Sequence, residues 1–214
     1  MRVVPFDDER AQRAALPDVV AHLRSGGLLL YPTETVFGLG GLTDIGATRA
    51  LAELKSRDAA KPFILLIDRR ELSVGLEWTD DALLLADAFW PGPLTLVLRD
   101  DAARYARGIR SEGGGVAVRE TPHAGVRLLL DALGEPVTST SANSPGAPPA
   151  RTQEEARALM SELSGRADVW LLDGPAGGAE PSTVVDCTGR RPRIVRAGAV
   201  SAERIREIVR DVEA

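Results

Sequence analysis

Residues 27–40 have the sequence GLLLYPTETVFGLG, which places a short apolar run directly before a polar turn. The apolar run, Leu28–Tyr31, lies between glycine and proline and is typical of a buried β-strand. Ligands of open α/β sheets bind beyond the carboxyl ends of the strands, which is where residues 32–35 stand. The same polar residues also suit a turn closed by hydroxyl and carboxylate hydrogen bonds. Taken alone, the stretch leaves a ligand site and a plain turn equally open.

Outward from this stretch, strand and helix patterns alternate along most of the chain. The alternation favours an α/β fold with a largely buried sheet. The short turn at Gly189 joins two late strands and predicts that part of the sheet is antiparallel. No repeat or convincing linker interrupts the pattern, so one domain is expected over residues 1–214. The other expected strands are 63–67, 94–98, 116–119, 136–140, 183–186 and 193–195, and the expected helices are 18–25 (begun by Pro17), 46–57, 80–89, 125–133, 152–163 and 201–212.

The composition narrows the class of protein. The chain is 44% hydrophobic, which is enough for a sizeable core, and its net charge of −5 argues against a protein that coats nucleic acid non-specifically. Cys187 is alone, so it has no intrachain disulfide partner, and one Cys with two distant His gives no zinc-ligand spacing. The longest aliphatic runs are too short to span a bilayer. A cytoplasmic protein without a metal centre is therefore expected.

The familiar nucleotide and hydrolase motifs do not occur. The chain has no GxxxxGK[ST] P-loop, no G-x-S-x-G elbow and no HExxH helix. Residues 38–43 resemble the dinucleotide motif GxGxxG, but Thr43 stands where the third glycine belongs. Any nucleotide must therefore be bound by a different arrangement.

A cluster of cations follows the predicted helix at 46–57. It holds Lys55, Arg57 and Lys61, and the two lysines are the only ones among 26 basic residues. Cations at a helix C-terminus complement the helix dipole by about 0.3–1 kcal/mol each, which is one explanation for them. Three positive charges within seven residues also suit a polyphosphate. The sequence leaves both explanations open.

Two later segments are unusually rich in small polar side chains. Residues 138–143 have the sequence TSTSAN after a predicted strand, and small hydroxyls can orient phosphate oxygens without bulk. Ser182 and Thr183 follow the glycines at 177–178, and Arg196 ends the last predicted strand. A glycine-rich turn allows close backbone approach to a ligand, although flexible loops have the same composition.

Seven motifs together carry a resemblance to a known family. PTETVFGLG, KxR, WPGPLT, VRxxPH, SxN, PST and RxG occur in the order that is typical of YrdC-type threonylcarbamoyl-AMP synthases, and the resemblance covers about residues 27–200. It implies a twisted mixed sheet of parallel and antiparallel strands with flanking helices around a large concave cavity. It also implies the short, single-domain form of the family.

The resemblance implies three groups of site residues. Those that would grip the ATP phosphates, and would do so by charge without a covalent nucleophile, are Lys55, Arg57, Ser141 and Asn143. Further ATP contacts would come from Lys61 and Arg196. Those that would hold L-threonine are Thr35, Arg119, Ser139 and Ser182. The chain departs from the pattern at Leu66, where many relatives carry a histidine near the threonine, and more mildly at Phe37 and Ala197.

The resemblance also implies a reaction. L-threonine and bicarbonate would condense to a carbamate, which attacks the α-phosphorus of ATP and releases pyrophosphate. ATP would arrive with Mg²⁺, and the product would pass to the tRNA threonylcarbamoyltransferase machinery, with a weak tRNA contact as a further expectation. Alternatives are a paralogue with another substrate, including carbamoyl transfer, and a non-catalytic RNA-binding module. The motion of residues 144–149, expected to form a flap-like loop, is left open.

Overall fold

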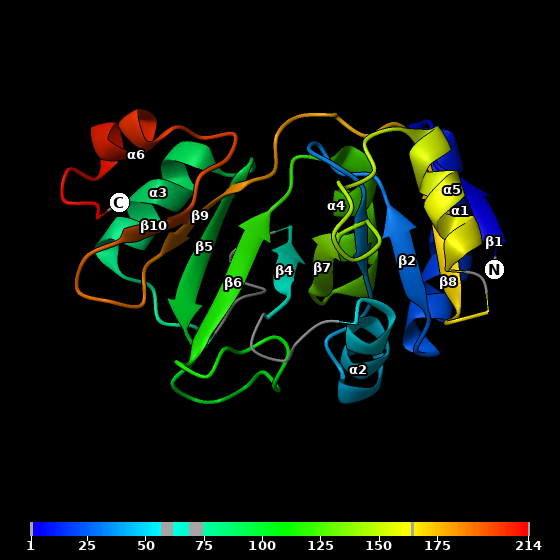
Figure 1. Ribbon diagram of the computed structural model, residues 1–214, viewed down its shortest axis with the longest axis horizontal. Helices are drawn as coiled ribbons and strands as arrows, with labels where there is room; N and C mark the ends of the chain where they lie inside the picture. Colours follow the sequence, from blue (N-terminus) through cyan, green and yellow to red (C-terminus); the bar gives the residue numbers. More distant parts are fainter. Residues whose placement is uncertain (1, 57–61, 69–74, 164, 214) are drawn as a thin grey trace.

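The computed structural model describes residues 2–56, 62–68, 75–163 and 165–213 (Figure 1). The described strands are β1 (Arg2–Pro5), β2 (Leu28–Tyr31), β3 (Gly38–Gly40), β4 (Ile64–Ile67), β5 (Leu94–Arg99), β6 (Gly115–Glu120), β7 (Val137–Ser141), β8 (Val169–Asp173), β9 (Thr183–Asp186) and β10 (Arg193–Arg196). The described helices are α1 (Glu9–Arg24), α2 (Ile45–Leu54), α3 (Asp80–Phe89), α4 (Ala124–Leu133), α5 (Gln153–Glu162) and α6 (Ala202–Ile208).

One mixed sheet runs across the molecule in the order β1-β8-β2-β3-β7-β4-β6-β5-β9-β10. The sheet contains parallel pairs, such as β4 with β6, and antiparallel pairs, such as β5 with β6. The predicted α/β class and mixed sheet are therefore confirmed, as is the antiparallel pairing of β9 with β10. Figure 1 shows α3 and α6 at one end of the sheet and α1 and α5 at the other.

Strand β2 is buried on both faces, as its apolar run predicts. Leu29 and Tyr31 pack into a core with α1 and α4, whereas Leu28 and Leu30 pack into a second core with α5. Burying one such leucine side chain stabilises the fold by about 1.5–3 kcal/mol. Because both faces are packed, the end of β2 is held firmly, and the polar turn that follows it has a fixed starting point.

Side-chain caps explain where the helices begin. Thr152 accepts a hydrogen bond from the Glu155 amide while the Glu155 carboxylate accepts one from the Thr152 amide, so the predicted capping box is present. Thr79 caps α3 with a single hydrogen bond, because its hydroxyl accepts from the Ala82 amide. Each cap of this kind contributes about 1 kcal/mol.

Three helix predictions are wrong at an end, and in one of them the helix expected over 46–57 already ends at Leu54. The first helix begins at Glu9 rather than after Pro17, because the Asp8 carboxylate accepts from the Ala11 amide at 2.8 Å and Pro17 is taken into the helix interior. The last helix ends at Ile208 rather than near 212. Beyond it the chain turns back, and Glu213 exchanges backbone hydrogen bonds with the segment around β10.

Strands β1, β3 and β8 were not predicted. Strand β3 contains two glycines, which weaken a strand by their own propensity. Its packing requires them, because a side chain on Gly40 would lie 1.7 Å from the carbonyl oxygen of Thr138 in the neighbouring segment. The close approach brings β3 against β7, and with it the turn after β2 against the polar residues of β7. None of the described helices is long and apolar enough to cross a membrane.

Candidate functional site

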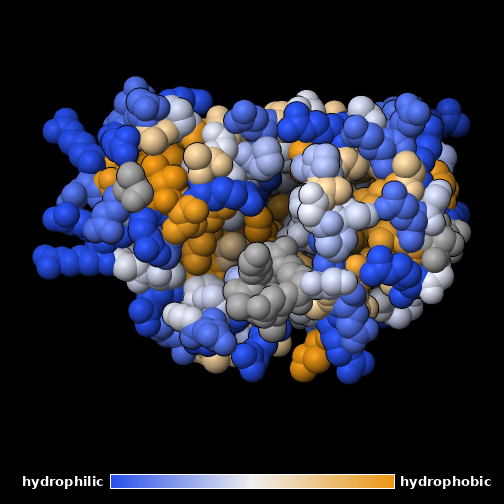
Figure 2. Space-filling model, viewed as in Figure 1, coloured by the Kyte–Doolittle hydropathy of each residue, from blue (hydrophilic) through white to orange (hydrophobic). Residues whose placement is uncertain are grey.

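A cavity of about 140 Å³ opens beyond the carboxyl end of β2. Figure 2 shows the corresponding face of the molecule hollowed near its middle. Most of the lining comes from the turn after β2, from β4 and β7, and from the segment before β9. The lining residues are Thr33, Glu34, Thr35, Val36, Phe37, Gly38, Ile64, Leu66, Arg119, Ser139, Thr140, Ser141, Pro181, Ser182 and Arg196.

The turn after β2 is both a well-bonded turn and one wall of the cavity. The Thr33 hydroxyl donates to the Val36 carbonyl at 2.6 Å and accepts from the Thr35 amide at 3.2 Å. The two hydroxyl oxygens of Thr33 and Thr35 lie 3.0 Å apart. Since the Thr33 proton is already given to Val36, Thr35 donates to Thr33 and keeps its own lone pairs for a ligand in the cavity.

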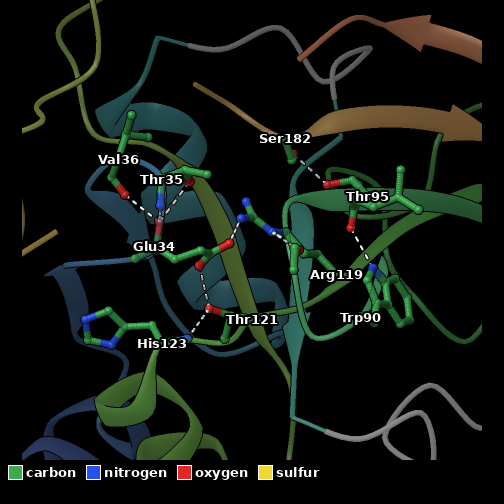
Figure 3. Close-up of polar contacts among 12 residues, drawn as sticks. Glu34, Thr35, Val36, Trp90, Thr95, Arg119, Thr121, His123 and Ser182 are labelled. Carbon is green, nitrogen blue, oxygen red and sulfur yellow. Dashed lines mark hydrogen bonds and ion pairs between the residues drawn. The ribbon is translucent and has the colours of Figure 1, made fainter. Parts of the chain in front are cut away.

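Arg119 enters the cavity from β6 and meets Glu34. Its Nη2 forms an ion pair with Glu34 Oε1, and its Nε donates to the Gly92 carbonyl at 3.2 Å (Figure 3). The Arg119 side chain is only 8% exposed. Burial, and secondly the charge of Arg196, lower the pKa of Arg119 to about 10. A pKa near 10 leaves the guanidinium charged at neutral pH.

Arg196 and Ser182 line the cavity from β10 and from the segment before β9. Arg196 Nη2 donates to the Ser182 carbonyl at 2.8 Å and to its hydroxyl at 3.0 Å. The Ser182 hydroxyl also lies 2.8 Å from that of Thr95, so it is fixed on two sides. Burial lowers the pKa of Arg196, but a guanidinium remains protonated near neutrality. The cavity thus has two cations facing it from separate strands.

Lys55, Ser141 and Asn143 are brought together, as the sequence predicts. Lys55 Nζ donates to the Ser141 carbonyl at 3.0 Å, to the Asn143 carbonyl at 2.6 Å and to Asn143 Oδ1 at 2.7 Å. The Ser141 hydroxyl donates to the same Oδ1 at 2.9 Å. Lys55 therefore ties the end of α2 to the end of β7. The predicted partners Arg57 and Lys61 lie outside the described residues.

Ser139 and Leu66 lie on adjacent strands at the cavity floor. Ser139 pairs with Ile64 in the register of β7 and β4, and Leu66 stands beside Arg119 in the register of β4 and β6. Leu66 is only 2% exposed, so it places an apolar wall where a histidine would place a polar one. Tyr31 lies fully buried behind this floor, and desolvation raises the pKa of its phenol.

Three residues to which the sequence analysis gave no role of their own support the site. Glu34 Oε2 accepts from the Thr121 hydroxyl at 2.8 Å, and Thr121 in turn accepts from the His123 amide (Figure 3). Glu34 lies inside the PTET motif, so its presence near the site could be expected from the sequence. Its pairing with Arg119 could not, because only the fold brings β6 beside the turn after β2.

His123 is the cap of α4 in its neutral form. Its Nδ1 accepts from the Val126 amide at 3.3 Å, so the proton of the neutral ring stands on Nε2, which faces the Pro175 carbonyl at 3.4 Å. Burial lowers the pKa of His123 below its usual value. A protonated ring could no longer accept at Nδ1, so the cap would be lost.

Acidification is therefore expected to weaken the fold through His123. A folded-state pKa below the unfolded value means that the unfolded chain binds more protons, so stability falls as the pH drops below about 6.5. His123→Asn keeps a good cap that does not titrate. Comparing denaturant unfolding at pH 7.5 and 5.5, we expect a smaller loss of stability in the variant than in the wild type. Equal losses would contradict the assignment.

Within the described part of the chain, the other polar regions differ from this cavity. Among the described residues, no three His, Cys, Asp or Glu gather closely enough to hold a metal ion. A wider hollow of about 690 Å³ lies at the turn between β9 and β10. Its walls carry both signs of charge, with Arg191 paired to Asp211 and Arg193 near Asp186. Cys187 is buried, and burial raises its thiol pKa to about 12, which fits a structural role.

Comparison with known proteins identifies the family of this chain. The Sua5/YciO/YrdC family model, described as "Telomere recombination", matches residues 21–198. A threonylcarbamoyl-AMP synthase of Chromohalobacter salexigens is 44% identical over 183 residues, which are 83% of this chain and 94% of the relative. The chain belongs to the Sua5/YciO/YrdC family. The resemblance drawn from the seven motifs is thereby confirmed.

Solved structures of this family share the fold. P. abyssi Sua5 complexed with L-threonine has a TM-score of 0.87 and 30% identity. The match covers 100% of this chain and 62% of that protein. This family member therefore spans less than two thirds of the length of P. abyssi Sua5. E. coli YciO has a TM-score of 0.80 and 26% identity, with 95% of this chain and 98% of YciO covered.

Proposed function

We propose that this family member is a nucleotidyltransferase that makes threonylcarbamoyl-AMP from L-threonine, bicarbonate and ATP, with release of pyrophosphate. The proposal is supported by the 44% identical relative of that name and by the L-threonine complex of P. abyssi Sua5. The observation that carries it is the cavity lined by both Arg119 and Arg196 together with the hydroxyls of Thr35, Ser139 and Ser182.

The size of the cavity suits an amino acid and not a whole nucleotide. Cavities for drug-sized ligands run from about 300 to 1,000 Å³, and this one is about 140 Å³. Threonine would place its carboxylate on the Arg119 fork, with its polar groups near Thr35, Ser139 and Ser182. Leu66 would contact the apolar side of the ligand.

ATP would lie at the rim of the same cavity. Ser141 is both a cavity residue and a partner of Asn143, so the cluster with Lys55 stands where phosphates could approach the amino acid. We propose that these residues and Arg196, with Arg57 and Lys61 from the segment outside the described residues, hold the ATP phosphates. Mg²⁺ would arrive with ATP, because magnesium commonly binds through substrate phosphates and one or two carboxylates.

Catalysis would rest on positioning and charge. Holding the carbamate in line with the α-phosphorus supplies effective molarity, and fixed cations stabilise charge on the oxygens around phosphorus. The ammonium of Lys55 is a compact charge that can follow such oxygens, and its present acceptors on Ser141 and Asn143 set its location. No covalent nucleophile is needed. We further propose that the product passes to a tRNA threonylcarbamoyltransferase, with at most a weak tRNA contact by this chain.

Substrate omission tests the proposed function. Pyrophosphate release from ATP should require L-threonine, bicarbonate and Mg²⁺ together, and should stop when any one is left out. Release that does not depend on threonine would overturn the proposal. AMP formation that depends on carbamoyl phosphate would support carbamoyl transfer, and tight RNA binding without turnover would support an RNA-binding module.

A further inference from the structure

Glu34 is the acidic member of the cavity lining. Among the described residues that line the cavity, the side chains of acidic or basic type are Glu34, Arg119 and Arg196. Glu34 Oε1 contacts Arg119, and Oε2 is held from behind by the Thr121 hydroxyl at 2.8 Å. Thr121 is completely buried and is itself fixed by the His123 amide. The carboxylate would thus stay in place if Arg119 turned to a ligand.

An adjoining cation and anion suit a zwitterion. An α-amino acid carries a carboxylate and an ammonium group on the same carbon. It can therefore separate the two members of an ion pair and offer each of them an opposite charge. The carboxylate would go to the Arg119 fork, which leaves Glu34 Oε1 facing the cavity and ready to accept from the ammonium. An acid that lacks the amino group would leave the Glu34 carboxylate buried without a cation, which is unfavourable.

We propose that Glu34 binds the α-ammonium group of the amino-acid substrate and accepts the proton that this nitrogen loses when the carbamate forms; this deepens the proposed function and rests on it. In that step the nitrogen forms a bond to the carbon of bicarbonate, and a C–O bond of bicarbonate breaks. The nitrogen loses two protons. One leaves with the departing hydroxide as water, and the other goes to Glu34.

The charges of the cavity balance after this step. The N-carboxylated amino acid carries two negative groups, its carboxylate and its carbamate. Before ATP and the cations around its phosphates are counted, Arg119 and Arg196 supply two positive charges, and Glu34 is neutral once it holds the proton. The site would therefore favour the carbamate over the free amino acid, because burying unbalanced charge is costly. An amine would have to lose its proton to water in the absence of Glu34.

Ligand binding to Glu34→Gln tests the first half of the proposal. Titration calorimetry would compare L-threonine with 3-hydroxybutanoate, which lacks the amino group, in the wild type and in the variant. Glu9→Gln, in the exposed ion pair with Arg13, is the matched control. We expect Glu34→Gln to weaken threonine binding by about tenfold to a hundredfold, the size of a lost charge-assisted hydrogen bond, and to leave 3-hydroxybutanoate unchanged or tighter.

Equal weakening of both ligands would overturn the proposal, since Glu34 would then only position Arg119. Unchanged or tighter threonine binding by Glu34→Gln would also overturn the proposal. Glu34 would then make no contact with the ligand, or would compete with it for Arg119. If the wild type prefers another amino acid to its des-amino form and the variant loses that preference, the role of Glu34 stands and the threonine assignment falls. If the wild type binds no amino acid, the role of Glu34 and the threonine assignment are both wrong.

The rate of turnover tests the second half of the proposal, the transfer of a proton to Glu34. At saturating threonine, bicarbonate and ATP, we expect kcat of Glu34→Gln to fall by about a hundredfold, a typical contribution of a general base, while Glu9→Gln keeps the wild-type rate. A raised KM with an unchanged kcat would overturn the proton transfer and leave only the ammonium contact. Thermal unfolding of both variants would verify that they are folded at the assay temperature.

Discussion

A double variant with methionine at Arg119 and glutamine at Glu34 is expected to lose threonine-dependent turnover by at least about a hundredfold and still fold. Each charge-assisted hydrogen bond contributes about 1.5–3 kcal/mol, and this variant removes both the cationic fork and the carboxylate from the cavity. Replacing a buried ion pair by neutral groups of similar size is often nearly neutral for stability. The measurement is kcat/KM for L-threonine beside a thermal unfolding curve.

The single variant Arg119→Met is a poorer test. It would leave Glu34 beside the cavity without its cation, and breaking a buried pair from one side costs on the order of 3–5 kcal/mol. Loss of activity could then reflect unfolding. The matched control for the double variant is Arg13→Met with Glu9→Gln, which removes an exposed pair on α1. A double variant at Arg119 and Glu34 that keeps the wild-type KM for threonine would contradict the site.

Lys55→Ala is expected to cut turnover at least tenfold with the fold intact. Its ammonium donates to three acceptors at the end of β7, and loss of one charge-assisted hydrogen bond to a phosphate would by itself exceed tenfold. We expect kcat to fall and KM for ATP to rise, while binding of threonine alone changes little.

The matched control is Arg49→Ala, which removes a cation from the same helix. Arg49 is 76% exposed and pairs only loosely with Glu53, so its loss should leave the rate unchanged. Wild-type rates in Lys55→Ala would show that Lys55 is only a helix-end charge. Falling rates in both variants would point to α2 as a whole and not to the Lys55 ammonium.

The fold was predictable where a local signal fixed it. Leu28–Tyr31 is apolar throughout and ends at Pro32, and Thr152 with Glu155 makes a cap that needs no tertiary contact. Prediction failed where a distant contact decided the outcome. Strand β3 exists because Gly40 lets the Thr138 carbonyl approach, and nothing in a run of glycines and leucine indicates that neighbour.

The same contrast between motifs that can be read in the sequence and contacts made only by the fold applies to the site. Lys55, Ser141 and Asn143 were expected together and do meet, and Thr35, Arg119, Ser139, Ser182 and Arg196 all line one cavity. Their assignment to ATP or to threonine stays a prediction. The pairing of Glu34 with Arg119, and its support by Thr121, depends on β6 lying beside the turn after β2. Only the assembled sheet shows that contact.

Direct detection of the product tests the central claim. The protein would be incubated with ATP, Mg²⁺, L-threonine and isotopically labelled bicarbonate. The nucleotides would be separated at once and their masses measured by mass spectrometry. The account predicts threonylcarbamoyl-AMP that carries one labelled carbon, formed in step with pyrophosphate. Conversion of ATP to AMP or ADP with no labelled carbon in any threonine-containing nucleotide would contradict it.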